Sequence, residues 1–290
     1  MILQKTIKNA IHMEGIGLHS GHNVRMKALP APVDTGIVFK RVDASPPLLI
    51  PIAVDRIEES LLCTRLASPI PDQDFSISTI EHLLSAIAAL EIDNLLIELD
   101  AGEIPIMDGS AAPYIFWLQS AGICELEEKR KFLKIKKTIR LEDQDKFVEL
   151  TPISKGFELS VSIDFAHPVI QKTPQQVEFT FHPMIYMKEI SRARTFGFVK
   201  DLEKLQANGL AKGASLENAV GIGDEAVLNP DGLRYEDEFV KHKLLDAIGD
   251  LYVAGPMIGK FTAHKSSHSL NNRLLRKLFS NESNYEWISL

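Results

Sequence analysis

The sequence lacks the features of an extracellular or membrane protein. Only two of its 290 residues are cysteines, Cys63 and Cys124, which is too few for a disulfide framework or a cysteine-rich zinc site. No apolar run reaches the ~18 residues of a membrane span, and polar residues interrupt the chain soon after Met1. We therefore expect no signal peptide, no transmembrane segment and a cytoplasmic location.

The sequence also has fewer basic than acidic residues, 32 against 39. The net charge is -7 and the isoelectric point is near 5.7, which argues against general nucleic-acid binding. Local lysines could still surround an anionic ligand. The chain is 45% hydrophobic and 24% charged, which is typical of a globular protein with a substantial core, and its length favours two domains over one.

Hydrophobic periodicity divides the chain into two halves of similar order. In the first half it predicts strands at 24–29, 36–42 and 95–99 and helices at 78–90 and about 112–121. In the second half it predicts strands at 133–140, 146–151 and 157–165, followed by helices at 183–191, 198–208, 236–253 and 269–279. A charged segment at 125–131 favours a domain boundary near residue 126. This order predicts two α+β domains packed together, residues 1–126 and 127–290.

The predicted helix at 236–253 carries three polar residues at helical spacing. His242, Asp246 and Asp250 recur every four residues beside an apolar stripe, so they lie along one face. An imidazole and a carboxylate one turn apart can both reach a divalent ion such as Zn²⁺. The alternative is an ordinary solvated pair that only favours the helix.

A second candidate pair is Glu81 and His82, near the start of the predicted helix at 78–90. Neighbouring side chains on a helix diverge by about 100°, which suits a metal-binding His82 with Glu81 facing a nearby water. The alternative is structural, because Ser78 and Glu81 fit a capping box and His82 would then be a polar residue at the helix edge.

The third candidate element is the polar turn with His264 and His268. Two histidines four apart could bind metal, but a histidine beside an aspartate could also serve as a proton donor, and Asp250 is the natural partner. The alternative is a helix cap with exposed histidines, in which the structural role falls to Ser266, Ser267 or Ser269.

Five motifs together are similar to those of a known enzyme family. They closely resemble, in the same order, the motifs of UDP-3-O-acyl-N-acetylglucosamine deacetylases of lipid A synthesis: Ser78-Thr79-Ile80-Glu81-His82-Leu83, Glu103 to Pro113, Ser191 to Gly197, His242 to Leu251, and His268-Ser269-Leu270-Asn271-Asn272. The resemblance implies two similar α+β domains with the active site between them. It also implies a monomeric hydrolase of a Gram-negative bacterium, whose substrate is a UDP-sugar lipid precursor with a 3-hydroxyacyl chain.

The resemblance also implies roles for single residues. It makes His82, His242 and Asp246 the ligands of one catalytic Zn²⁺, although two histidines and a carboxylate also suit Fe²⁺. It makes Glu81 the general base and His268 the general acid. The remaining catalytic residues that it implies are Asp250, which orients His268, and Thr195, which donates a hydrogen bond to the oxyanion.

Substrate contacts are implied in three regions. Lys243 and Lys265 match lysines near the carbohydrate and diphosphate. The nucleotide region corresponds to Lys146, Asp164 and Phe165, where Phe165 could stack on uracil. An insert near 196–223 would line an acyl passage, with the apolar residues Leu202, Leu210, Ala211 and Leu216. Core packing and surface charge are the alternatives for these residues.

The resemblance has one departure, and two other functions compete with it. Ser267 stands before the last catalytic histidine, where the family pattern usually has glycine. One competing function is a non-catalytic zinc-stabilised binding module, in which His264 would supply a fourth ligand. The other is a zinc hydrolase for a different amide, such as a peptide, which would need neither the lysines nor the acyl passage.

Overall fold

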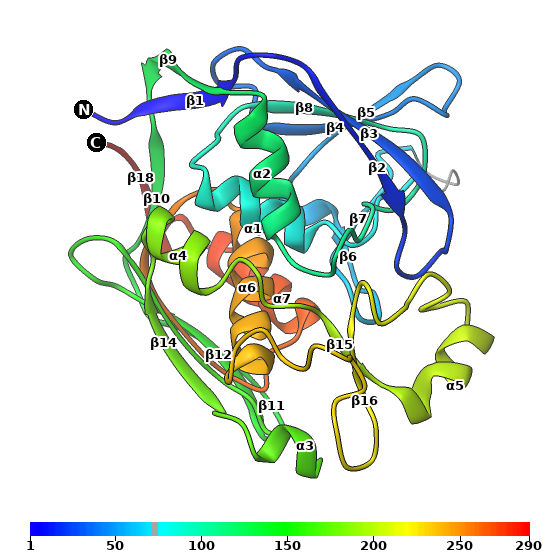
Figure 1. Cartoon of the computed structure of the whole chain (residues 1–290). Coiled ribbons are helices and arrows are strands. Elements are labelled where there is room, and N and C mark those ends of the chain that lie inside the picture. Colours follow the sequence, from blue (N-terminus) through cyan, green and yellow to red (C-terminus); the bar gives the residue numbers. More distant parts are fainter. Residues whose placement is uncertain (71–74) are drawn as a thin grey trace.

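Two β-sheets face each other across a layer of helices, and each sheet belongs to one half of the chain (Figure 1). The computed structural model describes residues 1–70 and 75–290. The two termini lie close together, since the Ile2 N–H donates to the Leu290 carbonyl over 2.9 Å. The chain therefore has the α+β architecture of two similar domains, each with a sheet packed on helices.

The N-terminal domain is built on a five-stranded sheet of order β2-β3-β8-β4-β5. Along β8 buried and half-buried side chains alternate, because only one face of the sheet packs on helices. The elements of this domain are β1 (Leu3–Ile7), β2 (Ile11–Ile16), β3 (Asn23–Pro30), β4 (Ile37–Arg41), β5 (Leu48–Pro51), η1 (Val54–Arg56), β6 (Ile57–Glu58), β7 (Arg65–Leu66), α1 (Glu81–Ala89), β8 (Leu95–Leu99), α2 (Ala112–Ser120) and β9 (Ile123–Lys129).

The C-terminal domain is built on a seven-stranded sheet in which β17 pairs with β10, β12 and β13. Helices α6 and α7 cover the face that turns toward the first domain (Figure 1). The elements are β10 (Lys131–Ile135), β11 (Ile139–Asp143), β12 (Lys146–Thr151), β13 (Phe157–Ser162), α3 (Pro168–Gln171), β14 (Gln176–Thr180), α4 (Pro183–Glu189), β15 (Phe196–Phe198), η2 (Val199–Asp201), α5 (Leu202–Ala207), β16 (Val220–Ile222), α6 (Glu238–Tyr252), β17 (Met257–His264), α7 (His268–Phe279), η3 (Glu282–Asn284) and β18 (Tyr285–Ser289).

Helices α1 and α6 meet at the centre of the molecule, where the two domains join. Gly249 makes this approach possible, because a Cβ added there would lie 1.9 Å from the Glu81 carbonyl oxygen. Nearly all of α6 is buried, which explains why its sequence shows apolar residues on several sides. The contact brings residues at the start of α1 beside residues in the middle of α6.

The structure differs from the sequence predictions in several details. Helix α1 begins at Glu81 rather than near residue 78, because Ser78 forms an isolated bridge with Glu103. The segment predicted as one strand at 133–140 is divided between β10 and β11. The predicted boundary near residue 126 falls inside β9, which pairs with β1, and we propose that all of β9 belongs to the first domain.

Within residues 1–70 and 75–290, no helix is long and apolar enough to cross a bilayer.

Candidate metal centre and active site

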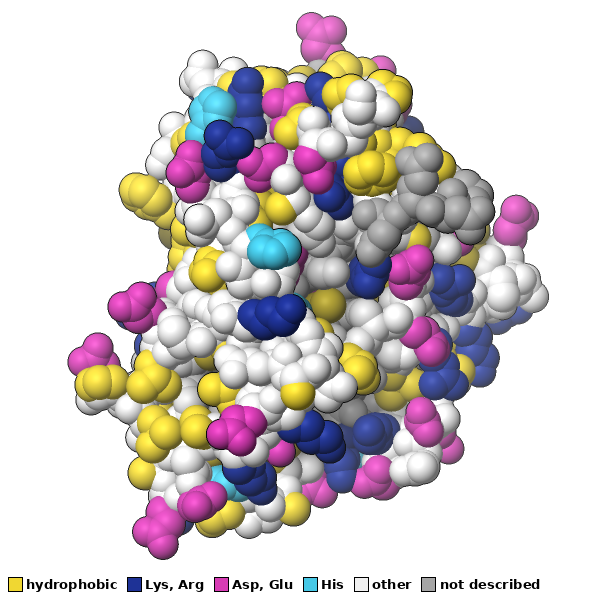
Figure 2. Space-filling model, turned by 90° about the vertical axis from the view of Figure 1, so that its right-hand side faces the viewer, with side chains coloured by type: hydrophobic (Ala, Val, Ile, Leu, Met, Phe, Trp, Pro, Cys, Tyr) yellow, Lys and Arg dark blue, Asp and Glu magenta, His cyan; other side chains and the backbone are white. Residues whose placement is uncertain are grey.

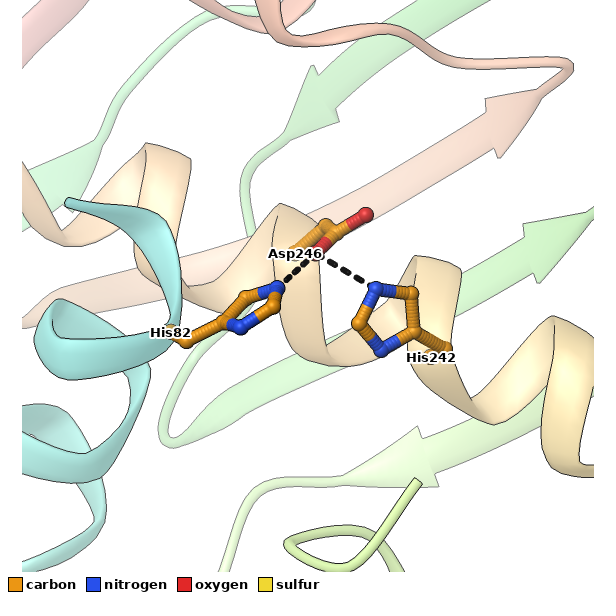
Figure 3. Close-up of side chains that lie close together, drawn as sticks. All are labelled: His82, His242 and Asp246. Carbon is orange, nitrogen blue, oxygen red and sulfur yellow. Dashed lines mark ion pairs between the residues drawn. The ribbon is translucent and has the colours of Figure 1, made fainter. Parts of the chain in front are cut away.

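Two imidazoles and a carboxylate meet where α1 contacts α6. His82 comes from α1, and His242 and Asp246 lie one turn apart on α6 (Figure 3). Both histidine Nε2 atoms lie 3.3 Å from the same oxygen, Asp246 Oδ1, and the two rings are nearly perpendicular with centroids 5.0 Å apart. One ligand atom from each residue lies within 4.8 Å of the other two, and all three residues are buried.

The donor atoms of this group are suited to a divalent cation. Asp246 Oδ1 is buried and has no hydrogen-bond partner, although it faces two ring nitrogens. His242 Nδ1 lies 3.0 Å from the Ala193 carbonyl, which can only accept, so Nδ1 carries the proton and Nε2 keeps its lone pair. Burial lowers the pKa of His242 from 6.5 to about 4, despite the opposing effect of Asp246, so the ring stays neutral as metal binding requires.

Lys243 fixes the other oxygen of the aspartate. Its Nζ donates to Asp246 Oδ2 over 2.7 Å. Burial opposes ionisation of Asp246, but His242 and Lys243 outweigh it and hold the pKa of the carboxyl well below its ordinary value. Lys243 therefore contacts the candidate metal ligand directly, a contact that the prediction of a substrate-binding lysine did not include.

Glu81 points into the site and does not cap its own helix. The predicted capping box is wrong, since α1 has Ile80 as its N-cap and no side-chain cap bond. The Glu81 carboxylate instead accepts the backbone N–H of Thr64 at Oε2 over 2.9 Å. Its side chain is almost fully buried, and this burial raises the pKa of Glu81 although His268 and His82 lie nearby. A raised pKa makes Glu81 a stronger base than an exposed carboxylate.

His268 and Asp250 form a hydrogen-bonded pair beside Glu81. His268 Nδ1 lies 2.9 Å from Asp250 Oδ2, and its Nε2 lies 4.0 Å from Glu81 Oε1. Burial alone would lower the pKa of His268, but the Asp250 and Glu81 carboxylates outweigh it and raise the pKa from 6.5 to about 9. The ring of His268 is therefore protonated on both nitrogens at neutral pH, as the imidazolium.

The structure distinguishes between the roles considered for the polar turn before α7, namely metal binding, proton donation and helix capping. Ser267 is the N-cap of α7, and its hydroxyl accepts the Leu270 N–H over 3.2 Å. Its φ of -138° is ordinary extended backbone, so no glycine is required at this position. The expectation of exposed histidines is wrong for His268, whose side chain is 12% exposed. His264 Nδ1 lies 2.9 Å from Ser162 Oγ and does not belong to the metal-binding group.

Thr195 lies in the segment that also orients His242. Its backbone N–H donates to the Gly109 carbonyl over 2.8 Å, and Ala193, two residues earlier, supplies the carbonyl for His242. Between them, Arg194 forms an ion pair with Glu238 over 2.8 Å, and the Glu238 side chain is fully buried at the start of α6. This segment is therefore anchored to the same helix that carries two of the three candidate ligands.

The predicted nucleotide residues lie together around the end of β17. Lys265 forms ion pairs with Asp145 and with Asp164, the second over 3.3 Å. Phe165 packs against two other phenylalanines, with ring centroids 5.5 Å from Phe196 and 6.3 Å from Phe198. Lys146, which is also predicted to meet the nucleotide, is exposed at the start of β12.

The predicted acyl-passage insert forms η2, α5, β16 and the loops around them. Leu202 and Leu210 are half-buried and Ala211 is buried, whereas Leu216 is 43% exposed and covers Gly221. The face turned to the viewer in Figure 2 lies on the α5 side of the molecule in Figure 1, and it shows apolar side chains mixed with lysines and arginines. The insert is therefore only partly packed against the core.

Comparison with known proteins places the chain in a family. Residues 4–280 match the model of the LpxC family, described as UDP-3-O-acyl N-acetylglycosamine deacetylase. The chain belongs to this family. Similar proteins named UDP-3-O-acyl-N-acetylglucosamine deacetylase include one from Shewanella sp. (strain W3-18-1), 54% identical, and one from Shewanella oneidensis, 53% identical. Each alignment spans 290 residues, which is 100% of this chain and 94% of the relative.

Sequence reasoning missed three polar residues that lie around the candidate site. His19 is buried near His82 and His268, and burial lowers its pKa. Asn271 donates to Asp250 Oδ2 over 2.8 Å, and its position one turn after His268 could have indicated this. Thr64 contacts two of the candidate catalytic residues, although its surrounding sequence has no recognisable motif.

Proposed function

We propose that the protein hydrolyses the N-acetyl group of UDP-3-O-(3-hydroxyacyl)-N-acetylglucosamine and releases acetate and the free amine, a step of lipid A biosynthesis. The observation that carries the proposal is the buried group of His82, His242 and Asp246, with Glu81 and His268 beside it. Membership of the deacetylase family and the names of the relatives support the same reaction. Water supplies OH to the acetyl carbon and H to the nitrogen as the C–N bond breaks.

The metal in this proposal is one Zn²⁺, held by His82 Nε2, His242 Nε2 and Asp246 Oδ1. Two imidazoles and one carboxylate are a donor set that would suit a catalytic zinc ion. When bound, the cation polarises the amide carbonyl and lowers the pKa of a water molecule. Fe²⁺ suits the same ligands and is the alternative metal.

Glu81 acts as the general base in this proposal. Its Oε2 is occupied by the Thr64 N–H, which leaves Oε1 to take a proton from the attacking water. Burial raises the pKa of Glu81 and so increases its affinity for that proton. The acid of the reaction must be a different group with a proton to give.

His268 supplies that proton to the departing amine nitrogen. Nδ1 is held by Asp250, so Nε2, on the side of Glu81, carries the proton that is donated. The Thr195 hydroxyl donates a hydrogen bond to the negative charge that develops on the acetyl carbonyl oxygen, an interaction worth about 3 kcal/mol in comparable sites.

The substrate's other parts need separate contacts. We propose that Lys243 and Lys265 lie near the carbohydrate and diphosphate, and that Lys146, Asp164 and Phe165 meet the nucleotide. The half-buried leucines of the 196–223 insert, Leu202 and Leu210 among them, contact the acyl chain together with Ala211 and Leu216. We further propose a monomer in the cytoplasm, a location that suits the two free cysteines.

Two variants test the division between metal binding and base catalysis. Glu81→Ala keeps the three ligands, so it retains metal and loses most turnover. His82→Ala removes a ligand, so it loses both metal and turnover. Amine release and bound metal are measured on each purified variant. A Glu81→Ala protein that releases amine at the wild-type rate would exclude Glu81 as the base.

A further inference from the structure

Thr64 lies between the proposed base and the partner of the proposed acid. Its backbone N–H donates to Glu81 Oε2 over 2.9 Å, and its hydroxyl donates to Asp250 Oδ1 over 2.5 Å. The residue is 2% exposed, and its own carbonyl accepts the Ile80 N–H over 3.3 Å. Thr64 therefore contacts the N-terminal end of α1 at two points and α6 at one point near its C-terminal end.

These contacts restrict two carboxylates that would otherwise rotate. With Oε2 bound to Thr64, the plane of the Glu81 carboxylate is fixed and Oε1 faces His268 Nε2. Asp250 is held by three donors, namely the Thr64 hydroxyl, the Asn271 amide and His268 Nδ1. One residue thus sets the orientation of the base and of the group that orients the acid.

We propose that Thr64 is a positioning residue for the hydrolysis, which holds Glu81 and Asp250 so that base and acid face the same scissile C–N bond. The inference rests on the roles proposed above for Glu81 and His268. Within residues 1–70 and 75–290, the hydrogen bonds of Thr64 reach neither the three candidate metal ligands nor the implied substrate contacts. It therefore acts on the rate of the chemical step and not on substrate or metal affinity.

Two substitutions separate the hydroxyl from the shape of the side chain. Thr64→Val removes the hydroxyl but keeps the volume and the backbone N–H, and we expect kcat to fall about 10- to 100-fold with KM unchanged. Thr64→Ser keeps the hydroxyl and loses a methyl group, and we expect kcat within about threefold of wild type. Thr64→Ala serves in place of the valine variant if that variant does not fold.

A buried threonine elsewhere in the chain provides the matched control. Thr6 on β1 is 3% exposed, and its hydroxyl accepts the Ala31 N–H over 3.0 Å. Thr6→Val therefore removes a comparable buried hydroxyl away from the site, and we expect it to lower the melting temperature without changing kcat. Melting temperature and bound metal are recorded for every variant.

A double-mutant cycle with Asp250→Ala completes the test, because alanine leaves the Thr64 hydroxyl without its acceptor. If Thr64 acts through Asp250, Thr64→Val lowers kcat far less in the Asp250→Ala background than in wild type. Full additivity, a wild-type kcat for Thr64→Val, or a serine variant no more active than the valine variant would each overturn the proposal. A wild-type protein without deacetylase activity would instead overturn the proposed function itself.

Discussion

The Asp250→Asn substitution should move the alkaline limit of activity to lower pH. His268 must be protonated to act as the acid, so activity is full below its pKa and is lost as the pH rises through that value. Its pKa is raised from 6.5 to about 9, against the effect of burial, by the carboxylates of Asp250 and Glu81. That difference corresponds to roughly 3 kcal/mol of preference for the imidazolium.

Replacing Asp250 removes the nearer of the two charges, while burial still lowers the pKa of His268. The pH dependence of kcat/KM reports the free enzyme. We therefore expect the pH at which kcat/KM is lost on the alkaline side to be lower by roughly 1.5 pH units or more. Loss of the orienting hydrogen bond should also lower the maximal rate about 100-fold. The assay is amine release as a function of pH for both proteins, with bound metal measured in parallel.

The result that would refute this reasoning is an Asp250→Asn protein whose alkaline limb coincides with that of wild type. Such a result would mean that His268 does not carry the catalytic proton or that Asp250 does not hold its charge. A lower rate with an unshifted limb would leave Asp250 only a structural role.

Two further predictions concern the helix contact and the acyl chain. Gly249→Ala would place a methyl group 1.9 Å from the Glu81 carbonyl, so α1 and α6 must separate by roughly 1.6 Å to reach an ordinary contact. We expect the free energy of unfolding, measured by thermal denaturation, to fall by about 1–3 kcal/mol. We also expect at least tenfold weaker metal binding, measured by chelator competition. A variant that binds metal with wild-type affinity would contradict this prediction. Leu210→Ser should lower kcat/KM about tenfold for a long-chain substrate and leave a short-chain analogue unaffected, because each buried methylene contributes about 0.8 kcal/mol. Equal losses for both chain lengths would place Leu210 outside the acyl passage.

Local patterns predicted the elements that have one buried face. The strand predicted at 95–99 coincides with β8 and the one predicted at 146–151 with β12, since side chains alternate along both. The strand at Met257–His264 was not predicted, because its first three residues are all buried and Gly259 interrupts the pattern. Burial on both faces removes the alternation from which a strand is recognised.

The candidate site could be predicted where its residues share one helix or one motif. The spacing of His242 and Asp246 places both on one face of α6, whereas the approach of His82 from α1 followed from the resemblance alone. Contacts across the fold could not be inferred in this way. Thr64 and Asp250 are 186 positions apart, so only the packing of the two domains brings them together.

The most direct test of the account is release of free amine from UDP-3-O-(3-hydroxyacyl)-N-acetylglucosamine by the purified protein, before and after chelation and again with zinc restored. We predict that the metal-replete protein releases amine, that chelation abolishes this activity, and that Zn²⁺ recovers it. A protein shown to carry one metal ion that releases no amine from this substrate would contradict the proposed deacetylase function.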